Sequence, residues 1–235
     1  MPVITMTGSL GSGAREVGQA VAARLGVDFV DQQLMVEAAQ RCGVPVGAVA
    51  AHDERRAGFR ERISSVLNTF LERSAASGAD PLTGNTGLEA ILSRSYADLT
   101  EDETPHVSDD LFLETTSAII RELSASGAIV ILGRGGQMVL ADQPRALHVL
   151  CVAPRDLRAQ RLAEREEIGM EEATRRVTEG DRARDAFYRK FWKVDVRDPR
   201  LYDIAVNTER VPYEMATEIV AQAATLKAGE TPASS

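Results

Sequence analysis

The sequence predicts an α/β protein built on a doubly wound, five-stranded parallel sheet. Short apolar segments alternate with helical patterns along the chain, and no internal repeat is detectable. Segments that are apolar throughout suit parallel strands buried on both faces, and right-handed crossovers would join them. The expected strands are Val3–Met6, Val27–Asp31, Ala128–Leu132, Ala146–Val152 and Asp203–Asn207.

The expected helices fill the intervals between these strands. The last one should turn Met215, Ile219, Val220 and Leu226 toward the core. A break at Ser77–Gly87, rich in glycine, proline and polar residues, is either a mobile loop over a binding site or a plain surface connection. The helices should close at Gly26, span Gln32–Cys42, Glu54–Ala76 and Leu88–Leu99, run from Ser108 to Gly127, start at Arg155, and span Met170–Trp192 and Tyr213–Lys227.

Composition limits the classes of partner. The 235 residues include 44% hydrophobic residues, enough to bury a full core. With 27 basic and 35 acidic residues, the net charge of -8 argues against a general nucleic-acid or anionic-membrane binder, so small molecules are the expected partners.

The N-terminus begins directly with a strand, and no apolar run is long enough to span a bilayer, which predicts a cytoplasmic protein. Cys42 and Cys151 lack ligand spacing and are expected to be reduced core thiols.

The stretch Val3–Glu16 predicts a nucleotide-binding loop. An apolar strand runs directly into a glycine-rich turn, and a helical pattern opens immediately afterwards. Small residues at Gly8, Gly11 and Gly13 would let backbone N–H groups surround phosphate oxygens, with hydroxyls available from Ser9 and Ser12.

Two side chains depart from the general phosphate-loop pattern. Ala14 stands where that pattern has lysine, and Arg15 stands where it has the magnesium-binding hydroxyl. Arg15 could supply the missing cation from the first helical turn, whereas a plain glycine-rich turn is the alternative. A dinucleotide-binding fold is a second alternative, supported by Asp28 and Asp31 as ribose ligands. The same two carboxylates could instead cap a helix or lie near Mg²⁺.

Arginines gather in two further places. Arg134 follows a buried strand within Gly133–Gly136, so it should emerge beside the glycine-rich loop. Two arginine-rich helices joined near residues 168–170 are typical of a lid that closes on phosphates. Positioning and charge cancellation are what phosphoryl transfer requires, and they could come from Arg15, Arg134, Arg161, Arg165, Arg182, Arg184 and Arg189.

The helix expected at Glu54–Ala76 carries one apolar face that includes Ile63, Val66 and Leu67. A helical period alone leaves two interpretations open. The face packs on the core of the same chain, or it forms a homodimer with a second subunit.

Taken together, several motifs resemble the cytidylate kinase-like branch of the P-loop nucleoside monophosphate kinases. They are GSGARE at 11–16, the strand ending at Asp31, ILGRGG at 131–136, DRARD at 181–185 and DPRLYDIAVNT at 198–208. The resemblance implies a P-loop kinase fold over 1–228, with a helical acceptor region at 32–110, a lid at 155–192 and a disordered tail at 229–235.

The resemblance also implies ATP and Mg²⁺, and CMP or dCMP as phosphoryl acceptor. Arg134 would contact the acceptor phosphate, and Arg182, Asp185 and Arg189 would contact phosphates or base. The full candidate set assigns catalysis to Arg15, Arg134, Arg182 and Arg184, and ATP binding to Gly8, Ser9, Gly11, Ser12, Gly13, Ala14, Arg15, Arg161 and Arg165. It assigns acceptor binding to Asp31, Arg134, Gly135, Asp185 and Arg189, and names no metal ligand. A nucleotide-binding regulator without catalysis is the alternative, because Ala14 and Arg15 replace the usual lysine and hydroxyl.

Overall fold

A computed structural model describes residues 1–41, 63–69, 85–98 and 109–229. Five strands form one sheet in the order β2-β3-β1-β4-β5, and every neighbouring pair is parallel. This confirms the predicted sheet. Because β3 lies between β1 and β2, the order differs from the 3-2-1-4-5 order of the dinucleotide-binding fold. The strands are β1 (Val3–Gly8), β2 (Asp28–Val30), β3 (Ile129–Leu132), β4 (Ala146–Val152) and β5 (Ile204–Asn207).

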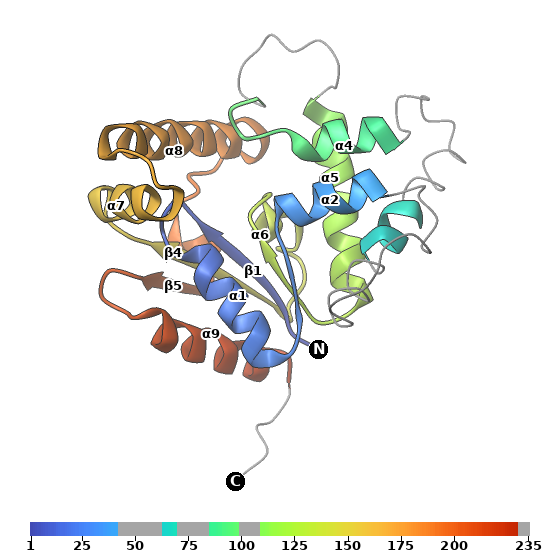
Figure 1. The fold of residues 1–235 in the computed structure, drawn as a ribbon. Coiled ribbons are helices and arrows are strands. Elements are labelled where there is room, and N and C mark those ends of the chain that lie inside the picture. The colour runs from blue at the N-terminus through green and yellow to red at the C-terminus, as the bar shows by residue number, and fades with distance from the viewer. Residues whose placement is uncertain (42–62, 70–84, 99–108, 230–235) are drawn as a thin grey trace, which may run out of the picture.

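Helices cover both faces of the sheet (Figure 1). One face carries α1 (Ala14–Leu25) and α9 (Tyr213–Lys227), which pack beside each other. The other face carries α2 (Gln32–Arg41), the helical residues 63–69, α4 (Asn85–Ser93), α5 (Asp109–Ser126) and the short α6 (Gly136–Val139). Beyond the carboxyl end of β1, α7 (Arg155–Glu166) and α8 (Met170–Trp192) lie side by side.

Alternation along the strands divides the core into two apolar clusters. Ile4 and Met6 of β1 point toward α1 and α9, whereas Val3 packs with residues of α4 and α5. Val130 and Ile131 of β3 divide in the same way. Because successive side chains of a strand point to opposite faces, a sheet with both faces covered needs the continuous apolar segments seen in the sequence.

The C-terminal end of α4 differs from the prediction. The helix ends at Ser93 instead of Leu99. Carbonyl groups at its end accept hydrogen bonds from side chains distant in sequence: the amide of Gln32 donates to Ser93 O at 3.0 Å, and the Arg134 guanidinium donates to Leu92 O at 2.6 Å. These donors satisfy carbonyl groups that would otherwise lack partners at a helix end. Two short elements were not predicted, α6 and a 3₁₀ turn at Pro199–Leu201.

The predicted inward face of α9 is wrong at three positions. Val220 is buried as expected, but Met215, Ile219 and Leu226 are 56%, 42% and 59% exposed. The buried face instead consists largely of small residues, including Ala216, Ala221 and Ala224. Small side chains allow α9 to lie close to the sheet and to α1, and the larger apolar residues then fall on the outer side.

Several predictions fall wholly or partly outside the described residues. Of the helix expected at Glu54–Ala76, residues 63–69 are described and helical, and Ile63, Val66 and Leu67 lie in the core of this chain. The homodimer remains a prediction. Most of the break at 77–87 and of the tail at 229–235 lies outside the described residues, as does Cys42. Within the part that is described, no helix combines the length and apolar character needed to cross a membrane.

Cys151 is a free, buried thiol, as predicted. Its position in β4 beneath α1 and α9 places it in an apolar environment, and burial raises its pKa to about 12. The thiolate is the reactive form of cysteine, so this side chain is a core residue and not a nucleophile.

Candidate functional site

The loop between β1 and α1 has the conformation that its glycines predicted. Gly11 and Gly13 have φ angles of 77° and 83°, in the left-handed region that glycine tolerates best. A Cβ atom at Gly11 would lie 2.4 Å from the carbonyl oxygen of Arg158 in α7. Ser12 N donates to Ser9 O at 2.9 Å, which closes the turn. The loop, residues 8–13, therefore delivers the first-turn N–H groups of α1 to the carboxyl edge of the sheet, where an anion can accept from them.

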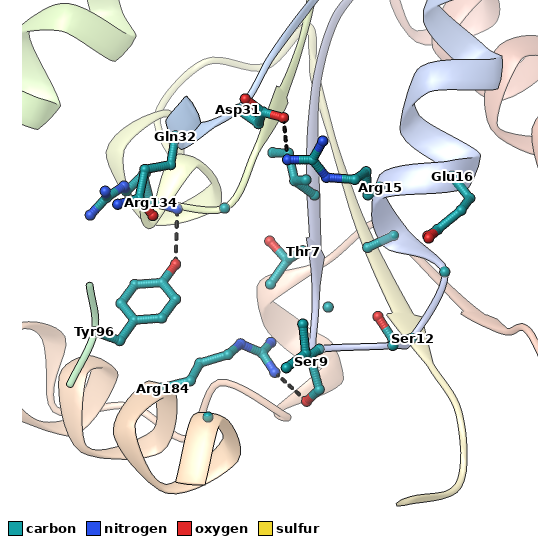
Figure 2. A pocket seen from close by; sticks show the side chains of 18 of the residues that line it. Thr7, Ser9, Ser12, Arg15, Glu16, Asp31, Gln32, Tyr96, Arg134 and Arg184 are labelled. Carbon is teal, nitrogen blue, oxygen red and sulfur yellow. Dashed lines mark hydrogen bonds and ion pairs between the residues drawn. The ribbon is translucent and has the colours of Figure 1, made fainter. Parts of the chain in front are cut away.

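A cavity of about 390 Å³ opens at this edge (Figure 2). Three parts of the chain line it: the glycine-rich loop with the first turn of α1, the segments that follow β2 and β3, and α7 with α8. Its volume lies within the usual range for small-molecule sites. The sequence-predicted residues that line it are Gly8, Ser9, Gly11, Ser12, Gly13, Ala14, Arg15, Asp31, Arg134, Arg165 and Arg184.

Arg184 approaches the loop from α8. Its side chain is buried, with the residue 6% exposed, and Nη1 donates to Ser9 Oγ at 2.9 Å. The second terminal nitrogen, Nη2, is buried and has no hydrogen-bond partner among the residues that the structure describes. Buried donors are nearly always satisfied, so an unpaired guanidinium N–H beside a phosphate-type loop indicates a place for a ligand oxygen. A smaller cavity of about 250 Å³ shares Ser9 and Arg184 and is bordered by Asp185.

Arg15 extends from the first turn of α1 toward Asp31, at the other end of the cavity from Arg184 (Figure 2). Its Nη2 lies 2.5 Å from Oδ2 of Asp31, and the Arg15 side chain remains 40% exposed. The other carboxylate oxygen of Asp31 accepts from Leu34 N at 2.9 Å, so Asp31 also caps α2. Ala14, in the position of the usual lysine, is buried in the apolar cluster beneath the loop.

Arg134 lines the cavity, but its guanidinium points away from the loop (Figure 2). Nη1 and Nη2 each donate at 2.6 Å, to Arg94 O and Leu92 O respectively. Burial lowers the pKa of Arg134 to about 10, which leaves the guanidinium charged at neutral pH. Its backbone N–H donates to the hydroxyl of Tyr96 at 2.9 Å. The geometry gives Arg134 a structural role at the end of α4, and its contact with an acceptor phosphate remains a prediction.

The two helices of the predicted lid contribute unequally. Arg161 donates to Thr208 Oγ1 and O, both at 2.9 Å, and lies over the ring of Tyr213. Arg165 lines the cavity and pairs with Glu16 at 3.5 Å. Arg182 and Arg189 are exposed and line neither cavity, because they lie on other faces of α8 than Arg184. Asp185 pairs with Arg197 at 3.0 Å, and Gly135 lies before α6 outside the cavity lining.

Arg158 holds α7, α8 and the loop together, a role that the sequence did not single out. Its guanidinium makes two hydrogen bonds to Asp181, at 3.0 and 2.7 Å, and one to Leu10 O at 3.3 Å. Substitution Asp181→Ala leaves this buried charge unpaired and is expected to cost about 2 kcal/mol in the free energy of unfolding. Urea denaturation measures the loss.

Glu179→Ala provides the matched control on α8. Glu179 pairs with Arg175 at 2.9 Å, and both side chains are 56% exposed. Its removal should cost less than about 0.5 kcal/mol. Equal losses for the two variants would contradict the role of Arg158.

A buried polar network under the cavity was also missed. Thr7 Oγ1 donates to Gln137 Oε1 at 3.1 Å, and Gln137 Nε2 donates to the hydroxyls of Tyr188 at 3.0 Å and Tyr202 at 3.3 Å. These side chains come from β1, α6, α8 and the segment before β5. In the sequence, this network could have been suspected from a polar residue, Gln137, that directly follows the glycine-rich turn after β3.

The residues present do not fit a protein-held Mg²⁺. Arg15 occupies the position of the ligating hydroxyl, and the carboxylates in the cavity lining, Asp31 and Glu16, are each paired with an arginine. Among the described residues, no group of three or more histidine, cysteine, aspartate or glutamate side chains could hold a metal ion. Mg²⁺ sites usually combine one or two carboxylates with substrate phosphates and water.

The sequence as a whole matches one family. The model of the cytidylate kinase-like family aligns with residues 3–210, which include β1 to β5, the loop, Arg134 and the paired helices α7 and α8. The chain belongs to the cytidylate kinase-like family.

Relatives within and near this family are distant. A cytidylate kinase from Methanopyrus kandleri is 33% identical over 98 residues, 38% of this chain and 51% of that protein. A shikimate kinase from Ruegeria pomeroyi is 36% identical over 92 residues, 39% of this chain and 43% of that protein. The chain thus spans about half the length, or less, of each of these curated relatives.

A solved structure supports the fold of this family member. An uncharacterized protein from Eubacterium ventriosum superposes with a TM-score of 0.62, covering 96% of this chain and 98% of that chain at 17% identity. At this identity the likeness shows the fold alone.

Proposed function

We propose that this cytidylate kinase-like protein catalyses ATP-dependent phosphoryl transfer to a small acceptor, a pyrimidine nucleoside monophosphate such as CMP or dCMP. The observation that carries the proposal is a cavity whose lining includes both the glycine-rich loop and the segments after β2 and β3. A donor nucleotide bound at the loop would thereby face an acceptor beside Asp31, Gln32 and Tyr96. In a doubly wound sheet, this edge is the usual ligand site.

In the proposed reaction an oxygen of the acceptor phosphate attacks the γ-phosphorus of ATP. A bond forms between that oxygen and phosphorus, the bond to the β–γ bridging oxygen breaks, and ADP leaves with the bond electrons. The chain's contribution is positioning and charge stabilisation, which suffice for this chemistry. We assign the triphosphate to the first-turn N–H groups of α1 and to Arg184, which has an unpaired buried N–H. No step is assigned to a metal ion.

Release of ADP from ATP tests the proposal across CMP, dCMP, UMP, AMP and GMP. We expect ADP release to be stimulated by CMP or dCMP above the rate without acceptor. Selective stimulation by a pyrimidine monophosphate supports the acceptor class. A panel without any stimulation, from protein that binds ATP, would contradict it.

Two observations favour other candidates, and the same panel distinguishes them. Replacement of the usual lysine and hydroxyl by Ala14 and Arg15 favours a nucleotide-binding regulator, which would bind ATP without turnover. Similarity to a shikimate kinase favours a small acceptor that carries a hydroxyl group and is comparable in size to shikimate. Adding shikimate to the panel tests that class directly.

A further inference from the structure

Arg15 stands at the point of the loop where a magnesium-binding hydroxyl is usual, and this departure has a structural counterpart. The side chain extends from the first turn of α1 into the cavity lining and retains 40% exposure. Its partner, Asp31, follows β2 and is 6% exposed at its side chain. The ion pair therefore crosses the cavity edge between the two segments that would hold the donor and the acceptor.

Asp31 pairs with one terminal nitrogen of the Arg15 guanidinium. One carboxylate oxygen lies 2.5 Å from Nη2 of Arg15, and the other accepts from Leu34 N at 2.9 Å. A guanidinium carries five N–H donors in a rigid plane, and the ion pair to Asp31 uses one edge of that plane. The remaining donors belong to a side chain that is already tethered at one nitrogen, so a phosphate oxygen binding to them would cost less ordering than binding to an untethered arginine.

The same arrangement disfavours a metal ion at this point. A divalent cation placed near the usual hydroxyl position would meet the positive charge of Arg15 and would compete with that charge for Asp31. Arg184 adds a second guanidinium at the other end of the cavity (Figure 2), with a buried N–H available to a phosphate oxygen. The two arginines thus line the same cavity, in which the phosphates of a nucleotide would lie.

We propose that the Arg15–Asp31 pair takes the place of a protein-held Mg²⁺ in this cavity, so that ATP binds with little dependence on divalent cations. The inference rests on the proposed nucleotide site and deepens it by naming a guanidinium that would donate to the phosphate oxygens. It concerns nucleotide binding, which can be measured apart from turnover.

Calorimetric titration of the full chain with ATP, in Mg²⁺ and in EDTA, tests the inference. For the unmodified protein we expect the two dissociation constants to agree within about threefold. This difference is smaller than the change in affinity that one charge-assisted hydrogen bond would produce. Arg15→Ser restores the hydroxyl and frees Asp31, so binding in EDTA should weaken by about tenfold or more and Mg²⁺ should recover most of the loss. Arg15→Lys keeps a cation opposite Asp31 and should retain the insensitivity to Mg²⁺.

Arg24→Ala is the matched control on the same helix. Arg24 pairs with Glu218 at 2.9 Å, and the two side chains are 59% and 62% exposed. It does not line the cavity, so its removal should leave both affinities unchanged. Thermal unfolding confirms that each variant is folded.

Two results would overturn the inference and leave the proposed function standing. One is tightening of wild-type ATP binding by Mg²⁺ of about tenfold or more, and the other is an Arg15→Ser variant with the wild-type ratio. No ATP binding to the wild-type protein in either buffer would overturn both the nucleotide site and the inference.

Discussion

Arg184→Ala is expected to lower kcat/KM for ATP-dependent transfer by about two to three orders of magnitude. The side chain is buried, bonds to Ser9 Oγ at 2.9 Å and holds an unpaired N–H beside the loop. An alanine removes both the contact that orients Ser9 and the cation proposed to stabilise the transferring group. Because a preorganised charge acts most strongly in a closed site, the loss should appear mainly in kcat. Steady-state assays with varied ATP measure it.

Arg175→Ala is the control for this prediction. Arg175 lies on the same helix, and its side chain is 56% exposed and pairs with Glu172 and Glu179. The substitution removes one positive charge from α8 without altering the cavity lining, so kcat/KM should stay close to the wild-type value. If both variants kept wild-type kinetics, Arg184 would have no part in the reaction. Arg184→Lys, which keeps the charge but loses the planar fork, should give an intermediate rate.

Gly11→Ala should abolish measurable ATP binding and destabilise the protein by about 3 kcal/mol. Gly11 has a φ of 77°, and its added Cβ atom would lie 2.4 Å from the carbonyl oxygen of Arg158. Since that oxygen belongs to the backbone of α7, it cannot rotate away like the end of a side chain. The loop must move, and its N–H groups then lose their common direction. Calorimetry and urea denaturation measure the two effects separately.

Gly26→Ala separates the steric clash from the backbone strain. Gly26 has a similar φ of 66°, but no heavy atom of the described part of the chain lies within 4 Å of a Cβ atom built there. This variant should lose about 1 kcal/mol of stability and keep its ATP affinity. If Gly11→Ala behaved in the same way, the close approach of α7 to the loop would not matter for nucleotide binding.

Much of the fold could be predicted because apolar runs and helical periodicity are local patterns in the sequence. The apolar runs at Ala146–Val152 and near β1 and β3 are strands in the structure, and α8 spans the predicted residues Met170–Trp192. The end of α4 could not be placed, because its carbonyl groups bond to Gln32 and Arg134, which are distant in sequence. Tertiary contacts of this kind leave no local periodicity.

The candidate site shows the same limit for the arginines. The sequence proposed seven arginines for the site, and four of them, Arg15, Arg134, Arg165 and Arg184, line one cavity. The sequence could not show which guanidinium would bond to backbone carbonyls, as Arg134 does, or which arginine of α7 would pair with Asp181. Helical periodicity can place Arg184 and Arg182 on different faces of α8. The hydrogen-bond partners of each arginine, however, depend on how the helices pack.

The fate of the γ-phosphate shows directly whether the protein transfers it to CMP. Protein incubated with γ-labelled ATP and CMP would be followed by chromatographic separation of the products. We expect label in CDP, formed at a rate that Arg184→Ala reduces strongly. Label that stays in ATP, or appears only as inorganic phosphate, would contradict transfer to CMP.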